Sequence, residues 1–130
     1  MNIRAIHHIA ILTDNDHYET SKRFYIDLLG FTVIRETYRE ARKSYKLDLA
    51  IAGKYQIELF SFPDYRERGS YPEAKGLRHL AFAVENVDMA AEELRSKGVP
   101  TEAVRIDELS SRKFVFFTDP NGQPLELYEE

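Results

Sequence analysis

The sequence predicts an α+β protein made of two similar modules, each a strand followed by a helix and then by further strands. Three observations support this: the chain contains an internal repeat, the repeated motifs are evenly spaced, and the size suits one domain. The repeat matches His8-Ile9-Ala10-Ile11 to His79-Leu80-Ala81-Phe82. Because 130 residues with 43% hydrophobic content can bury a core without disulfides, we expect both modules to share one domain.

The spacing of the motifs separates the repeat from coincidence. Gly30 and Glu58 are 28 residues apart, and Gly98 and Glu126 are separated by the same number. A further match aligns Ile57-Glu58-Leu59-Phe60 with Leu125-Glu126-Leu127-Tyr128. We therefore expect a single domain, 1–130, with modules at about residues 4–62 and 76–129 joined by the loop 63–75.

The first module is expected to begin with a strand at residues 6–12. A helix follows, with one apolar face formed by Tyr18, Ser21, Tyr25 and Leu28. Gly30 is expected to end this helix in a left-handed conformation. Segments rich in β-branched and aromatic residues then predict strands at 31–35, 45–52 and 55–61, with a hairpin turn at Gly53-Lys54.

The second module repeats this order. A strand is expected at residues 80–84, and Asp88 is the expected N-cap of a helix that ends at Gly98. Two strands follow at 114–118 and 125–128, on either side of the turn Asp119-Pro120-Asn121-Gly122.

Composition and charge exclude several classes of function. The absence of cysteine removes disulfides, iron-sulfur clusters, thiolate zinc sites and a cysteine nucleophile. The net charge is -4 and both signs are mixed along the chain, so no basic stripe for nucleic acid is expected. The basic stretch 35–46 contains acidic residues too, which favours a solvated strand edge. With no signal peptide or membrane span recognised, we expect a cytoplasmic protein without membrane partners.

The repeat places one histidine and one glutamate at matching points of both modules. They are His8 and Glu58 in the first module, and His79 and Glu126 in the second. Strand alternation puts their apolar neighbours on the opposite face. Taken singly, such residues are more often structural, but their coincidence with the repeat favours a metal site. Two imidazoles and two carboxylates suit one divalent transition ion, namely Ni, Zn, Co, Mn or Fe.

One further histidine, His7, has no histidine counterpart in the second module, where Arg78 stands. Strand alternation would point His7 away from His8, so we expect a structural role for it.

Apolar residues of the first module are expected beside the glutamate. Counted back from the hairpin at Gly53, odd-numbered residues fall opposite Glu58. Leu47 and Leu49 would then line a substrate pocket. Packing in the core is the alternative interpretation of both leucines.

The second module is expected to add aromatic residues and a cation. If Phe116 pairs with Glu126 across the turn, then Phe114 and Arg112 share the same face. Arg112 would anchor a carboxylate or phosphate of the substrate, and a solvated strand end is the alternative for this residue.

With these residues in place, the chain resembles the vicinal oxygen chelate superfamily, which includes glyoxalase I, extradiol dioxygenases and fosfomycin-resistance proteins. The resemblance runs end to end and is strongest to short bacterial glyoxalase-like proteins. It is carried by residues 7–11, 24–31, 76–82 and, most specifically, by Thr118-Asp119-Pro120-Asn121-Gly122-Gln123-Pro124-Leu125-Glu126-Leu127. It implies paired βαβββ modules, a curved sheet that encloses a metal ion, and a homodimer.

All four ligand positions match the glyoxalase I branch, and this implies a metal-dependent lyase or isomerase. Its substrate would be a small carbonyl compound or a thiol adduct of one, converted through a metal-stabilised enediolate. By this resemblance Glu126 is both ligand and general base, and Glu58 acts on the opposite face of the substrate. The segment after Glu58 lacks the asparagine-tryptophan-glycine typical of glyoxalase I, which argues against glutathione. Three alternatives stay open: a metal-dependent thiol transferase, an extradiol-type dioxygenase, and a non-catalytic small-molecule-binding protein.

Overall fold

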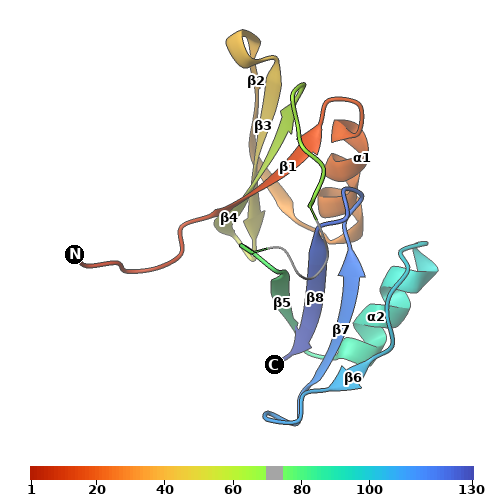
Figure 1. Ribbon diagram of the computed structural model, residues 1–130. Helices are drawn as coiled ribbons and strands as arrows, with labels where there is room; N and C mark the ends of the chain where they lie inside the picture. The colour runs from red at the N-terminus through yellow and green to blue at the C-terminus, as the bar shows by residue number, and fades with distance from the viewer. Residues whose placement is uncertain (70–74) are drawn as a thin grey trace. The chain divides into compact units, whose positions relative to one another are not determined.

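The computed structural model describes residues 1–69 and 75–130, and the chain forms two compact units, Met1–Arg66 and Glu67–Glu130 (Figure 1). Each unit contains a four-stranded mixed sheet and one main helix. This arrangement confirms the predicted α+β class and its two tandem βαβββ modules. Part of the expected loop 63–75, residues 70–74, lies outside the described residues.

The first unit is built on a sheet with the strand order β1-β4-β3-β2. The strands are β1 (Ile9–Asp14), β2 (Thr32–Arg39), β3 (Ser44–Ile51) and β4 (Lys54–Phe62). Helix α1 (Tyr18–Arg23) continues into a π-helical turn, Phe24–Leu28, and a short 3-10 turn, Glu40–Arg42, links β2 to β3. Strand β1 runs parallel to β4, and the other neighbouring strands are antiparallel.

The second unit has the same topology, with the strand order β5-β8-β7-β6. Its elements are β5 (Leu80–Val84), α2 (Val87–Ser96), β6 (Arg105–Ile106), β7 (Lys113–Thr118) and β8 (Pro124–Glu129). The sequence predicted all of these except β6, which is too short to show a periodic pattern.

Both helices use their apolar faces to cover one side of their own sheet. In α1 the predicted residues Tyr18 and Ser21 are buried, and Tyr25 in the following turn is fully buried. Gly30 and Gly98 follow the two helices with φ of 76° and 82°, as expected for residues that end a helix in the left-handed region.

The N-cap of α2 differs from the prediction. Asn86, not Asp88, caps this helix, because the Asn86 Oδ1 accepts a hydrogen bond from the Met89 backbone N at 2.9 Å. Asp88 lies in the first turn and forms an ion pair with Lys113.

The expectation that Leu47 and Leu49 share the face of Glu58 is wrong. Strand β4 carries one extra residue: Tyr55 pairs with Ala50, but Ile57 pairs with Leu49, so the register shifts by one. Such a β-bulge changes which residues share a face. Leu47 and Leu49 are therefore fully buried on the helix side and belong to the core, not to a pocket beside Glu58.

No helix in the described part of the chain has the length and apolar character needed to cross a membrane.

Candidate metal and substrate site

The first unit brings His8 and Glu58 together. Ala10 lies opposite Glu58 in the parallel pairing of β1 with β4, and His8 precedes Ala10 by two residues. The His8 Nε2 consequently lies 3.4 Å from the Glu58 Oε2. Glu58 is 8% exposed and His8 is more open to solvent, so the carboxylate of the pair is buried while the imidazole reaches solvent.

The second unit repeats this relationship with His79 and Glu126. Ala81 lies opposite Glu126 in the parallel pairing of β5 with β8, and His79 again stands two residues earlier. The His79 Nε2 lies 3.0 Å from the Glu126 Oε2. Each unit thus supplies one imidazole and one carboxylate from equivalent positions.

The spacing within each pair suits ligands that share one metal ion. With metal–ligand bonds of about 2.1 Å, neighbouring ligand atoms are separated by about 3.0 Å in an octahedral site and about 3.4 Å in a tetrahedral one. The two measured nitrogen–oxygen distances, 3.4 and 3.0 Å, fall at these values. The donor chemistry and the geometry of each pair therefore fit a divalent transition ion. Among residues 1–69 and 75–130, no three metal-ligating side chains gather in one place.

The second carboxylate oxygen of Glu58 is held by residues that the sequence analysis did not identify. The Lys46 Nζ lies 2.8 Å from the Glu58 Oε1, and the Tyr55 hydroxyl donates a hydrogen bond to the same oxygen. Lys46 also contacts the Asp48 Oδ1 at 2.9 Å, and Arg35 reaches the Asp48 Oδ2 at 3.3 Å. Glu58 therefore turns Oε2 toward His8 while Oε1 is fixed from the other side.

These contacts control ionisation around Glu58. Burial raises the pKa of Glu58, but the hydrogen bonds from Lys46 and Tyr55 outweigh it and hold that pKa below its ordinary value. Asp48 behaves in the same way, with Lys46 and then Arg35 lowering its pKa against burial. The two carboxylates in turn raise the pKa of Lys46, and burial together with the Glu58 contact raises the pKa of Tyr55. Glu58 and Asp48 are both anionic at neutral pH.

The face of Glu126 is aromatic, as predicted. Phe116 pairs with Glu126 across β7 and β8, and Phe114 lies two residues away on the same face. The ring of His79 meets Phe116 edge to face, with centroids 5.0 Å apart. The pairing expected from the turn is thus confirmed, and binding of substrate by Phe114 and Phe116 stays a prediction.

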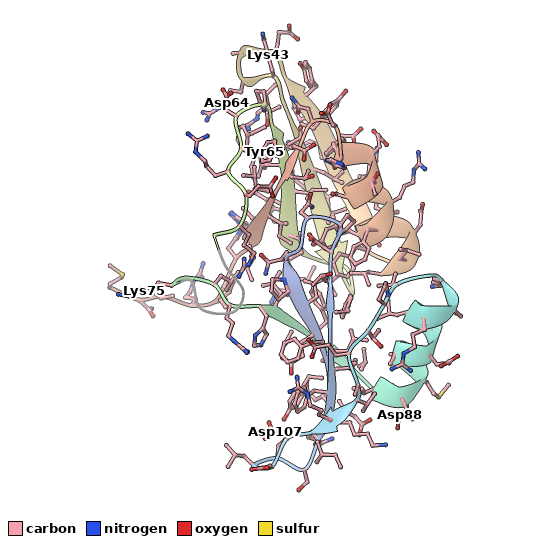
Figure 2. The ribbon with its side chains drawn as sticks, turned by 45° about the vertical axis from the view of Figure 1, so that its right-hand side comes forward. Lys43, Asp64, Tyr65, Lys75, Asp88 and Asp107 are labelled. Atoms are coloured by element: carbon pink, nitrogen blue, oxygen red, sulfur yellow. The ribbon has the colours of Figure 1, made fainter. Side chains whose placement is uncertain are left out.

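Arg112 is not carried inward by a strand. Strand β7 begins at Lys113, and exposed Arg112 closes a loop in which the Asp107 backbone N donates to the Arg112 carbonyl at 2.8 Å. Figure 2 labels Asp107 in this loop. The Arg105 guanidinium takes the expected place instead, 5.0 Å from the ring centroid of Phe114. Sequence reasoning missed Arg105 because β6 was not predicted.

His7 does not point away from His8. The two rings are in contact, with their Nδ1 atoms 2.8 Å apart, and His7 also meets Tyr55 edge to face at 5.3 Å. Strand alternation fails here because β1 begins only at Ile9, after both histidines.

Two sheets of identical topology, each pairing a histidine with a glutamate, define a protein of duplicated βαβββ modules with one candidate pair of metal ligands in each module. The chain matches the sequence profile of the Glyoxalase/Bleomycin resistance protein/Dioxygenase superfamily over residues 5–127, and it belongs to that superfamily.

Relatives share the whole length of the chain. It is 58% identical to the uncharacterized protein YwkD of Bacillus subtilis (strain 168), with all of both chains covered. It is 53% identical to the uncharacterized protein YaeR of Escherichia coli (strain K12), over 100% of this chain and 99% of that one. Among solved structures, a glyoxalase family protein from Enterococcus faecalis is similar at a TM-score of 0.88 and 43% identity, covering 99% of this chain and 100% of that one.

Proposed function

We propose that this protein is a metal-dependent lyase or isomerase of the glyoxalase type that acts on a small carbonyl compound or its thiol adduct. The observation that carries the proposal is the duplicated pairing of His8 with Glu58 and of His79 with Glu126, each at a nitrogen–oxygen distance that suits two ligands of the same ion. Both pairs would hold one divalent ion, chosen from Ni, Zn, Co, Mn and Fe. When bound, such an ion stabilises negative charge that develops on a substrate oxygen.

The two glutamates are held differently, and this supports different roles. Glu58 is fixed through Oε1 by Lys46 and Tyr55, which leaves Oε2 to face the metal position. Such contacts to a ligand keep it oriented. Glu126 has no further ion pair or side-chain hydrogen bond besides His79 among the described residues. We assign Glu126 as the general base that takes a proton from the substrate carbon, and Glu58 as the anchored ligand.

The aromatic face beside Glu126 supports the assignment of the base. Phe116 is 8% exposed and lies directly opposite Glu126, so the carboxylate has an apolar neighbour on one side. An apolar surround keeps water away from a proton-transferring carboxylate and strengthens its interactions with the substrate. Phe114 and Phe116 would contact the apolar part of the substrate.

A homodimer in the cytoplasm belongs to the same proposal. The four ligands would come from one chain or from two chains that exchange modules. Light scattering after size-exclusion chromatography measures the mass, and a mass near 15.2 kDa at micromolar concentration would contradict the dimer.

Elemental analysis tests the metal requirement directly. Protein expressed with supplemented metals is compared with the variants His8→Ala and Glu126→Gln. His17→Ala is the control, because His17 lies 2.8 Å from Asp14 and is not one of the four proposed ligands. We expect about one divalent ion per four-ligand site in the wild type and in the control, and a large loss in the two site variants. Wild-type protein without metal would overturn the proposal.

Substrate turnover then separates the proposed lyase from its alternatives. Metal-loaded protein is assayed with methylglyoxal and several thiols, and in parallel for oxygen uptake with catechols. Loss of the hemithioacetal with Glu126-dependent kinetics supports the proposal. Oxygen uptake, or binding of small molecules without any turnover, would replace the lyase with a dioxygenase or with a binding protein.

A further inference from the structure

The face of the first sheet that carries Glu58 also carries a row of cations and aromatic rings. We call it the Glu58 face; it comprises the side chains that lie away from α1. Pairing across the strands places Arg39 beside Ser44, and Lys46 beside Phe60, on this same face. The basic stretch 35–46 was predicted to be a solvated strand edge. Some of its side chains, including Arg39 and Lys46, instead lie on the same face of the sheet as Glu58.

Two guanidinium groups on this face rest on aromatic rings. The Arg39 Cζ lies 4.9 Å from the centroid of Phe60 and 5.6 Å from that of Phe62. The Arg42 Cζ lies 5.6 Å from the centroid of Phe62. A guanidinium within about 6 Å of a ring centroid is attracted to the ring as a cation, and its N–H groups can still donate to an acceptor.

The same two arginines lack an anionic partner in the part of the chain that is described. Arg35 and Lys46 are already paired with Asp48, and Lys46 also with Glu58. Within residues 1–69 and 75–130, the one polar contact of the Arg39 side chain is made by its Nη2, which donates to the Ser44 Oγ at 3.0 Å. No ion pair involves Arg42 among these residues.

Arg39 also presents a buried donor without an acceptor. Its Nε is shielded from solvent and has no hydrogen-bond partner within the described residues. Buried donors are nearly always satisfied, so an orphaned one points to a missing acceptor such as a bound ion. An oxyanion could accept from Nε and from the adjacent Nη2, which carries two N–H groups and shares one edge of the guanidinium with Nε; this edge gives the usual two-point recognition of phosphate or carboxylate by arginine.

We propose that Arg39 and Arg42, which lie over the rings of Phe60 and Phe62, form an oxyanion site that binds the phosphate or carboxylate group of the substrate. This inference deepens the proposed function and rests on it, because the bound oxyanion is taken to be part of the substrate of that reaction. Phe60 and Phe62 follow Glu58 by two and four residues on one face of β4, about 7 and 13 Å along the strand. The substrate class is therefore a carbonyl compound or thiol adduct that also carries an oxyanion, bound about 7–13 Å along β4 from Glu58.

Titration calorimetry with inorganic phosphate and with succinate tests this site. We expect millimolar binding of at least one probe to the wild type, a rise in Kd of about tenfold in Arg39→Gln, and a smaller rise in Arg42→Gln. Arg35→Gln is the matched control, because it removes the same charge from the same strand and face but from an arginine already paired with Asp48. Its Kd should change less than about twofold.

The relative affinities for phosphate and succinate show whether the site exists and which group it binds. Tighter binding of phosphate identifies a phosphate group, and tighter binding of succinate identifies a carboxylate. Absence of binding for both probes, or an equal loss in Arg35→Gln, overturns the proposal. If Arg39→Gln fails to fold, Arg42→Gln still tests the site, because Arg42 is exposed and its replacement does not disturb the core.

The metal proposal is tested separately in the same samples. Every variant is titrated once after chelation and once with metal, and its metal content is measured. Loss of oxyanion binding at unchanged metal content locates the effect at the arginines. A wild type that binds the probes but no metal would sink the proposed function while leaving the oxyanion site in place.

Discussion

Asp48 and Glu58 lie directly opposite each other on β3 and β4, and the ammonium of Lys46 bridges their carboxylates. The Lys46 Nζ lies 2.9 Å from Asp48 and 2.8 Å from Glu58. Like charges placed opposite each other across a sheet are destabilising, and here both carboxylates are also largely buried. The lysine therefore makes this pairing of two anions compatible with the fold.

Replacement of this lysine should destabilise the first unit. We expect Lys46→Met to lower the free energy of unfolding by about 2 kcal/mol at pH 7, since it leaves two buried carboxylates without their shared cation. Urea denaturation of chelated protein measures this. The double variant Lys46→Met with Asp48→Asn should recover at least half of the loss, because one of the opposed charges is then removed. A double variant as unstable as Lys46→Met would contradict the role of charge.

The position of this lysine also shows where sequence reasoning reached its limit. The repeat was sufficient to predict that His8 lies near Glu58. Their proximity depends only on the parallel pairing of β1 with β4, which places Ala10 opposite Glu58. The face of β3 depended on the hairpin, where Gln56 is inserted without a glycine or other turn residue to mark it. A single inserted residue moved Leu47 into the core and brought Asp48 to Glu58.

The second unit was predicted more closely for the same physical reason. No bulge interrupts the pairing of β7 with β8, so counting from the turn at Pro120 placed Phe116 opposite Glu126 correctly. Arg105 could not be found in this way, because β6 has only two residues and so shows no alternation of apolar and polar side chains.

A second prediction concerns Glu36, which joins α1 to β2. The Tyr18 hydroxyl donates to the Glu36 Oε2 at 2.6 Å, and the Lys22 Nζ lies 2.7 Å from the same oxygen. Burial raises the pKa of Glu36, but these two contacts outweigh it and hold the pKa below its ordinary value of 4.5. We expect Glu36→Gln to lower the free energy of unfolding by about 1 kcal/mol at pH 7. The loss is modest because the ion pair of Glu36 with Lys22 is partly exposed.

The pH dependence of that loss has a defined sign. Because folding lowers the pKa of Glu36, its contribution is complete above pH 4.5 and is lost as the pH falls through the folded value. The difference in unfolding free energy between wild type and Glu36→Gln should therefore shrink below pH 4.5. Glu40→Gln, an equal charge change at an exposed residue, is the control. A difference that stays constant down to pH 3 would exclude ionisation of Glu36 as its origin.

A third prediction distinguishes the two candidate caps of α2. Asn86→Ala should lower the free energy of unfolding by about 1 kcal/mol, because the Met89 backbone N loses its acceptor. Asp88→Ala should cost less than about 0.5 kcal/mol, since its ion pair with Lys113 is exposed. Thermal denaturation of both variants shows which of them loses more stability. A larger loss in Asp88→Ala would mean that the helix begins where the sequence pattern first placed it.

The last prediction concerns the cation beside the aromatic face of Glu126. The Arg105 guanidinium lies 5.0 Å from the centroid of Phe114 and 5.5 Å from that of Phe116. Once a turnover assay is established, Arg105→Ala should raise KM several-fold and leave kcat nearly unchanged, because it removes a binding contact and no proton-transferring group. Arg112→Ala should change KM less than about twofold. The opposite order would restore Arg112 as the anchoring residue and would require its loop to close over the face of Glu126.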